Sequence, residues 1–151
     1  MSEIIARLND DVKTAMKARD EFRLGVLRML SSKLKDAQIA QGRDAPLTEP
    51  QVIQVLASYA KQRAEAAETF GQAGRPDVRD RELRERDIVM EYLPKQLDDD
   101  AIRAVVREII AGTGAASARD LGKVMGPSMA RLKGQADGTR VQAIVKELLS
   151  G

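Results

Sequence analysis

The chain has 151 residues, with 25 Lys and Arg against 23 Asp and Glu, and it contains no Cys, His or Trp. Without a thiol or an imidazole, the sequence excludes disulfides, the usual zinc, haem and iron–sulfur ligand sets, and nucleophiles activated by a histidine. A chain of this length forms one domain or two small ones.

The N-terminal 17 residues carry acidic side chains and lack the apolar core of a secretory signal. No apolar run along the chain approaches the roughly 20 residues that a membrane-spanning helix needs. We therefore expect a cytoplasmic protein with no membrane partner.

Through the first 93 positions, apolar side chains recur every three or four residues, which is the spacing of amphipathic helices. Thr48 and Gln51 have the spacing of a capping box, and Pro46 lies in the loop before them. Five Arg alternate with five acidic residues over 75–87, a pattern typical of a solvent-facing helix with intrahelical ion pairs. The spacing predicts four helices, over residues 5–16, from 22 to near 42, 48–71 and 76–93.

The segment from Pro94 to Asp100 contains a proline and three consecutive Asp, and it predicts a domain boundary. Asp98 is placed to cap a fifth helix. Because successive side chains at a helix start point in different directions, capping explains the three Asp better than a metal site does. We expect no metal and no cofactor.

Helical spacing continues after this boundary, over 102–110 and again over 141–149, where Asp137 is placed to cap the last helix. No segment shows the alternation of a half-buried strand. The sequence therefore predicts an all-α protein. Its two parts are a helical N-terminal domain over 1–93 and a small helical C-terminal domain over 95–151.

The stretch from 117 to 140 carries several patterns at once. Ser117 and Asp120 resemble a capping box with a shorter acid. Apolar residues keep helical phase from Leu121 to Leu132, across Pro127. A proline costs ~3 kcal/mol inside a helix, so we expect two short helices nearly in line, or one kinked helix, broken at Gly126–Pro127.

Small residues recur every four positions through this stretch, and each glycine in a helix costs ~1 kcal/mol against alanine. The simpler interpretation is that another helix of the chain packs very close. The alternative is that a molecule from outside approaches the backbone. The small residues are Ala118, Gly122, Gly126, Ala130 and Gly134, and the candidate close-approach glycines are Gly122, Gly126, Gly134 and Gly138.

Basic side chains accompany the glycines. Residues 101–151 hold eight basic and four acidic side chains, which makes this third the better candidate for an anionic partner. With no aromatic residue among them, any nucleic-acid contact should recognise phosphates and shape rather than bases. An ordinary solvated face is the alternative. The candidate nucleic-acid-binding residues are Arg119, Lys123, Arg131, Lys133 and Arg140.

Several segments resemble the GatB/YqeY family, and the resemblance covers nearly the whole chain. It implies a stand-alone YqeY-like protein with an all-α fold. Its C-terminal domain would be similar to the tail of the B subunit of the glutamine-dependent aspartyl/glutamyl-tRNA amidotransferase, where the domain helps to hold tRNA. The segments are Arg23–Met29, the hinge Glu91–Leu97, Asp120–Gly126, Lys133–Gly138 and Val141–Leu149.

The resemblance leaves three functions open. The first hypothesis is a non-catalytic, tRNA-associated binding module linked to aminoacyl-tRNA or amidotransferase function. The second is an adaptor for a tRNA synthetase or an amidotransferase subunit. The third is a part in glutamine-dependent tRNA amidation, the carbon–nitrogen ligase activity that the family label implies. The chain has no Cys or His for glutamine hydrolysis and no G-x-x-x-x-G-K-[ST] loop for ATP, so we expect no catalytic residue.

Overall fold

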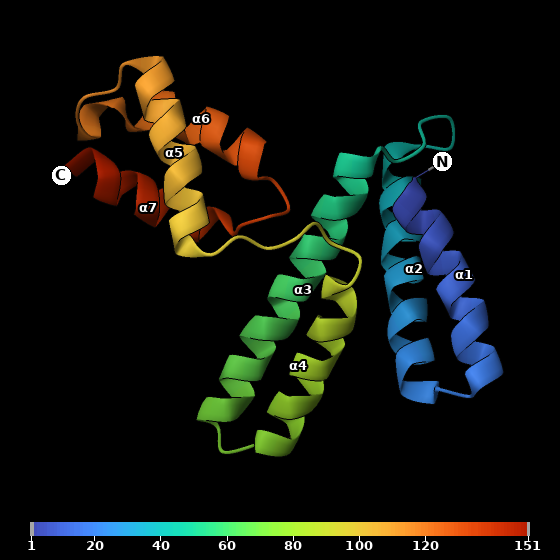
Figure 1. The fold of residues 1–151 in the computed structure, drawn as a ribbon. Helices are drawn as coiled ribbons and strands as arrows, with labels where there is room; N and C mark the ends of the chain where they lie inside the picture. Colours follow the sequence, from blue (N-terminus) through green and yellow to red (C-terminus); the bar gives the residue numbers. More distant parts are fainter. Residues whose placement is uncertain (1, 151) are drawn as a thin grey trace. The chain divides into compact units, whose positions relative to one another are not determined.

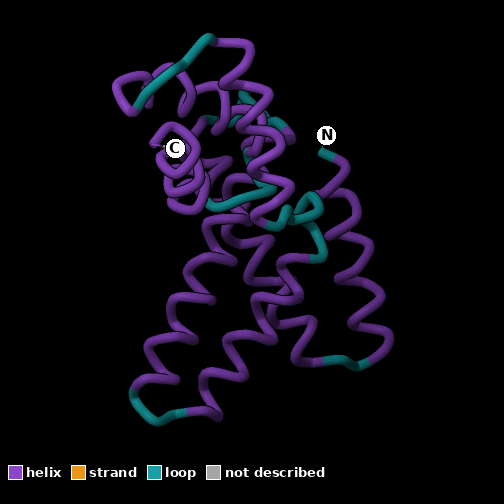
Figure 2. The backbone as a smooth tube through the Cα atoms, turned by 60° about the vertical axis from the view of Figure 1, so that its left-hand side comes forward, coloured by secondary structure: helices purple, strands orange, loops and turns teal. Residues whose placement is uncertain are grey.

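The computed structural model describes residues 2–150, and within them the chain forms seven α-helices, one short 3-10 turn and no strand (Figures 1 and 2). This confirms the all-α prediction. The chain divides into two compact units, Met1–Leu93 and Pro94–Gly151, and each has a hydrophobic core of its own. None of the described helices is long and apolar enough to cross a bilayer.

The first unit consists of two antiparallel helical hairpins, α1 with α2 and α3 with α4 (Figure 1). Fully buried leucines and valines of all four helices share its core. Thr48 begins α3 with the predicted capping box, because its side chain accepts from the Gln51 N–H while Gln51 accepts from the Thr48 N–H. The helices are α1 (Glu3–Ala18), α2 (Glu21–Gln41), α3 (Glu49–Gln72) and α4 (Pro76–Met90).

The residues that follow α4 are held against the first hairpin. Tyr92 is buried, its hydroxyl donates to Asp11 of α1, and burial raises the pKa of that hydroxyl. The guanidinium of Arg7 lies 4.5 Å from the centre of the Tyr92 ring. Arg23 of α2 pairs with Glu91 at 2.7 Å. The Glu91–Tyr92 part of the predicted hinge is therefore an anchor within the first unit.

The second unit packs three helices around a core of branched aliphatic side chains. Ile102 and Val106 of α5, Val124 of α6, and Val141 and Val145 of α7 are fully buried there. Asp98 caps α5 by accepting from the Ala101 N–H at 2.8 Å, as predicted. The elements are α5 (Asp99–Thr113), a 3-10 turn η1 (Ala118–Asp120), α6 (Leu121–Leu132) and α7 (Gly138–Ser150).

The linker after Pro94 belongs to the second unit. The Gln96 side chain donates to the Gly134 carbonyl at 2.6 Å, and the Leu97 N–H donates to the Gln135 carbonyl at 2.9 Å. These bonds tie the start of the unit to the loop between α6 and α7. The loop that carries Lys133 and Gly134 is thus held by the linker.

Of the two predicted alternatives at Gly126–Pro127, that of two short helices is wrong, because α6 runs through Pro127 as one helix. Pro127 is exposed, while Val124, Ser128 and Leu132 form the buried face of the helix. Burying that face offsets the backbone hydrogen bond that the proline cannot donate. Tertiary packing therefore overrides the local preference of the sequence.

Replacing this proline will stabilise the second unit. Pro127→Ala restores an N–H donor inside α6 and will raise the free energy of unfolding by about 2 kcal/mol, after the added entropy of the unfolded chain is subtracted. Urea unfolding measures the change. Gly126→Ala is the matched control and will add about 1 kcal/mol, since a Cβ at Gly126 meets nothing within 4 Å. A loss of stability in Pro127→Ala would contradict this account of α6.

Candidate nucleic-acid interface

The exposed side of α6 brings small residues and basic residues together. At 100° per residue, Gly122, Lys123, Gly126 and Ala130 fall within an arc of about 100° on the helix surface. All four are exposed, and the arc lies opposite the buried face. Arg119 in the preceding turn and Lys133 directly after the helix are exposed at its two ends. We call these six residues the α6 face.

The glycines of the α6 face are open. A Cβ added at Gly122 or at Gly126 would meet nothing within 4 Å. No helix of the second unit therefore packs against them among the described residues, and the interpretation of this seam as internal helix packing is wrong at both positions. What remains is a strip of helix whose backbone is accessible from outside.

The other two candidate glycines, Gly134 and Gly138, have structural roles within the chain itself. Gly134 has a φ of +79°, a conformation that glycine adopts without steric cost. At Gly138 an added Cβ would lie 3.0 Å from the Met129 Cε, so the last helix begins in close contact with α6. These two positions build the loop between α6 and α7.

The five predicted basic residues separate into two groups. Arg131 pairs with Glu108 at 2.7 Å, and Arg140 pairs with Asp99 at 2.6 Å; both pairs are about half-exposed, so they hold the guanidiniums at α5 only weakly. Within residues 2–150, Arg119 and Lys133 have no acidic partner.

Lys123 lies 3.5 Å from Asp120, and its side chain is 69% exposed. Exposed ion pairs of this kind contribute about 0–1 kcal/mol, so a phosphate can replace the carboxylate at little cost. Lys123 therefore belongs with Arg119 and Lys133 as a cation that is available to an anionic ligand.

Asp120 fixes the turn that leads into α6. Its carboxylate accepts from the Ala116 N–H at 2.9 Å, and this bond together with nearby Lys123 lowers the pKa of the carboxyl group. The Ser117 hydroxyl accepts from the Arg119 N–H. The resemblance to a capping box pointed to these two side chains, and in the structure they hold η1, which carries Arg119.

The positive charge of the second unit is confined to part of its surface. Residues 94–151 contain nine basic and seven acidic side chains, a net charge of +2, and no aromatic residue. Three of the acids, Asp98 to Asp100, lie at the start of α5. The α6 face is thus a small basic strip with an accessible backbone, suited to phosphate contacts and without a platform for stacking bases.

The three consecutive Asp have separate structural roles. Asp98 caps α5, Asp99 pairs with Arg140, and Asp100 pairs with Arg103 at 3.0 Å. In the part of the chain that the structure describes, no three Asp or Glu side chains cluster as a metal site would require.

Comparison with known proteins gives one family and several relatives. A family model described as a Yqey-like protein matches residues 5–149. Three fungal proteins named Altered inheritance of mitochondria protein 41, mitochondrial, are similar to part of the chain. The Lachancea thermotolerans protein is 36% identical over 90 residues, 59% of this chain and 47% of that protein.

The other two relatives have similar coverage. The Eremothecium gossypii protein is 28% identical over 92 residues, 61% of this chain and 50% of that protein. The Clavispora lusitaniae protein is 30% identical over 90 residues, 60% of this chain and 51% of that protein. The chain spans about half the length of the curated relatives it matches.

Proposed function

The chain belongs to the YqeY-like protein family, and from that premise we propose that it is a tRNA-associated binding module that is not catalytic by itself. The observation that carries the proposal is the α6 face, where available cations flank a strip of open glycines. The link to aminoacyl-tRNA or amidotransferase function rests on the resemblance of the C-terminal segments to the tail of the amidotransferase B subunit.

The chemistry of the α6 face favours a folded RNA over a single strand. Lys and Arg side chains bind phosphates and release the counterions that the RNA had condensed. The open backbone at Gly122 and Gly126 allows a sugar–phosphate chain to approach closely. Single-strand binding relies on aromatic stacking, which the second unit cannot supply. A base-paired RNA such as tRNA presents its phosphates in a fixed arrangement.

We propose a cytoplasmic location for this activity, as the composition suggests. The curated relatives carry the word mitochondrial in their names. Fractionation of cells that express the tagged full-length protein tests the location. Recovery with an organelle rather than with the cytosol would contradict it.

The binding proposal predicts a salt dependence. Purified protein will bind total tRNA with micromolar affinity at 50 mM salt, and three phosphate contacts will give a log–log slope of about −2 to −3. Affinity will then fall roughly 16- to 64-fold between 50 and 200 mM salt. Fluorescence anisotropy with labelled tRNA measures both values. Absence of binding at 50 mM salt, where electrostatic attraction is strong, would refute the proposal.

A further inference from the structure

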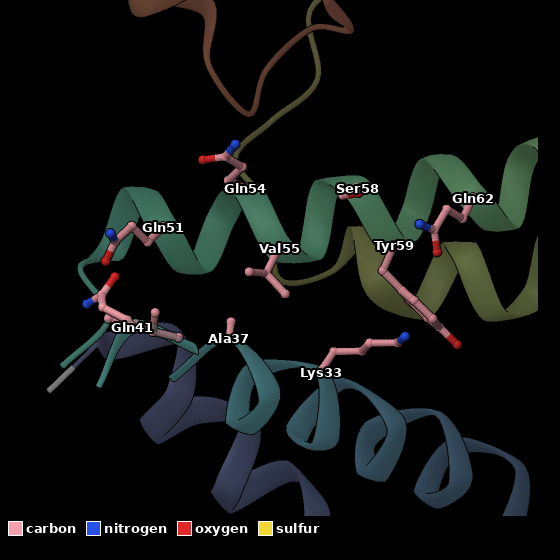
Figure 3. Close-up of a pocket in the computed structure, with 10 residues that line it drawn as sticks. Lys33, Ala37, Gln41, Gln51, Gln54, Val55, Ser58, Tyr59 and Gln62 are labelled. Atoms are coloured by element: carbon pink, nitrogen blue, oxygen red, sulfur yellow. The ribbon is translucent and has the colours of Figure 1, made fainter. Parts of the chain in front are cut away.

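The first unit contains an elongated groove between α2 and α3, with a volume of about 420 Å³ (Figure 3). Its lining residues on α2 are Lys33, Ala37 and Gln41, spaced four apart. Residues four apart lie on one side of a helix, so the three form one continuous wall. The lining residues from the loop and from α3 are Leu47, Gln51, Gln54, Val55, Ser58, Tyr59 and Gln62.

The middle of the groove is apolar and lined by short side chains. Figure 3 shows Val55 of α3 pointing toward Ala37 of α2. Because neither side chain is long enough to fill the space between the helices, the groove stays open at this point. The middle therefore offers room for one small apolar side chain.

One end of the groove is rigid. The Gln38 amide donates to the Gly42 and Ala45 carbonyls at 2.8 Å and accepts from the Leu47 N–H at 3.0 Å. Gln41 donates to the Ala45 carbonyl at 2.6 Å. The loop between α2 and α3 is thus fixed by side-chain bonds, so this end needs little ordering when a ligand binds.

The opposite end carries the one charge that lines the groove. Lys33 is exposed and has no ion pair within the described residues, and Figure 3 shows its ammonium group directed toward Tyr59. Tyr59 is 8% exposed, and its burial raises the pKa of the phenol. Around this end, Ser58 and Gln62 have side chains without a hydrogen-bond partner in residues 2–150. The charge of Lys33 is therefore not neutralised by any carboxylate of the described residues. Beside it, the polar side chains of Ser58 and Gln62 are available for hydrogen bonds.

We propose that this groove binds an extended peptide segment of another protein, with a carboxylate side chain seated on Lys33. The neutral amides have both donors and acceptors, which is what a peptide main chain requires. The wall from Lys33 to Gln41 is eight residues of helix, about 12 Å, and suits several residues of an extended strand.

The groove also specifies the spacing of the side chains it accepts. Lys33 and Ala37 are one turn apart, about 6 Å along α2. Same-side residues of an extended peptide are two positions apart, about 6.6 Å. The peptide therefore carries an acidic residue two positions from a small apolar residue, the acid on Lys33 and the apolar side chain between Ala37 and Val55. This surface lies in the first unit and does not depend on RNA binding by the second.

A random heptapeptide library displayed on phage, selected against the whole immobilised protein, tests the proposal. Selection will enrich peptides with Asp or Glu two positions from Ala or Val. A synthetic peptide of the enriched sequence will bind Lys33→Glu at least tenfold more weakly. The control Lys35→Glu, an exposed lysine of α2 that does not line the groove, will change affinity less than twofold.

A second pair of variants tests the shape of the groove separately from the charge of Lys33. Ala37→Leu fills the apolar middle and will weaken the peptide at least tenfold, while Ala40→Leu, outside the lining, will leave it unchanged. Circular dichroism checks that both variants fold. Failure of the library to enrich acidic peptides, or equal binding to Lys33→Glu and Ala37→Leu, would overturn the proposal. So would a loss of tRNA affinity that is larger in Lys33→Glu than in Lys35→Glu, because the groove would then belong to an RNA surface.

Discussion

The triple variant Arg119→Glu, Lys123→Glu and Lys133→Glu will bind total tRNA roughly 100-fold more weakly than the native protein at 0.1 M salt, or weaker still. Each substitution removes a phosphate contact with its counterion release and adds a repulsive carboxylate. The log–log salt slope will also fall toward zero. Fluorescence anisotropy across a salt series measures affinity and slope together.

A matched variant separates the α6 face from net charge. Lys13→Glu, Lys17→Glu and Arg28→Glu together change the net charge by the same amount at exposed positions of the first unit. This control will lower affinity only a few-fold, through long-range repulsion that salt screens. Equal losses in the two triple variants would show that the α6 face is not the contact surface.

Leu132→Ala will have the largest effect on stability, a loss of about 2–5 kcal/mol in the second unit. Leu132 is 1% exposed and lies in the core formed by α5, α6 and α7. A unit of this size has a total stability of roughly 3–9 kcal/mol, so the loss consumes a large part of it. Because the proposed RNA-binding residues lie on α6 and at its two ends, tRNA affinity will fall with it.

Hydrogen exchange resolved along the chain checks where the loss falls. In Leu132→Ala, amide protection will decrease in α5, α6 and α7 and persist in the first unit, since the two cores are separate. Leu27→Ala, at a fully buried position of the first core, will show the reverse pattern. Loss of protection in both units together would contradict two separate cores.

Local sequence signals accounted for the helices and most of their ends. Capping by Thr48 and by Asp98 follows from side chains within three residues of the bonds they make. The choice between two short helices and one helix at Pro127 did not follow, because the cost of Pro127 is local whereas its compensation comes from packing against α5 and α7.

The candidate site was only partly predictable for the same reason. The sequence identifies basic residues but not their partners, and Arg140 bonds to Asp99, 41 positions away. Whether Gly122 and Gly126 are packed or open depends likewise on where the neighbouring helices lie. Sequence reasoning did not find the groove between α2 and α3. The four-residue spacing of Lys33, Ala37 and Gln41 was a signal for a common face, but only the fold places that face opposite α3.

The most direct test of the central claim is a map of backbone amide signals in ¹⁵N-labelled protein during titration with substoichiometric total tRNA. Binding at the α6 face will broaden the amides of residues 118–134 first, with Gly122 and Gly126 among the most affected. Broadening concentrated in residues 2–93, with the amides of α6 unchanged, would contradict the claim that the second unit holds the RNA.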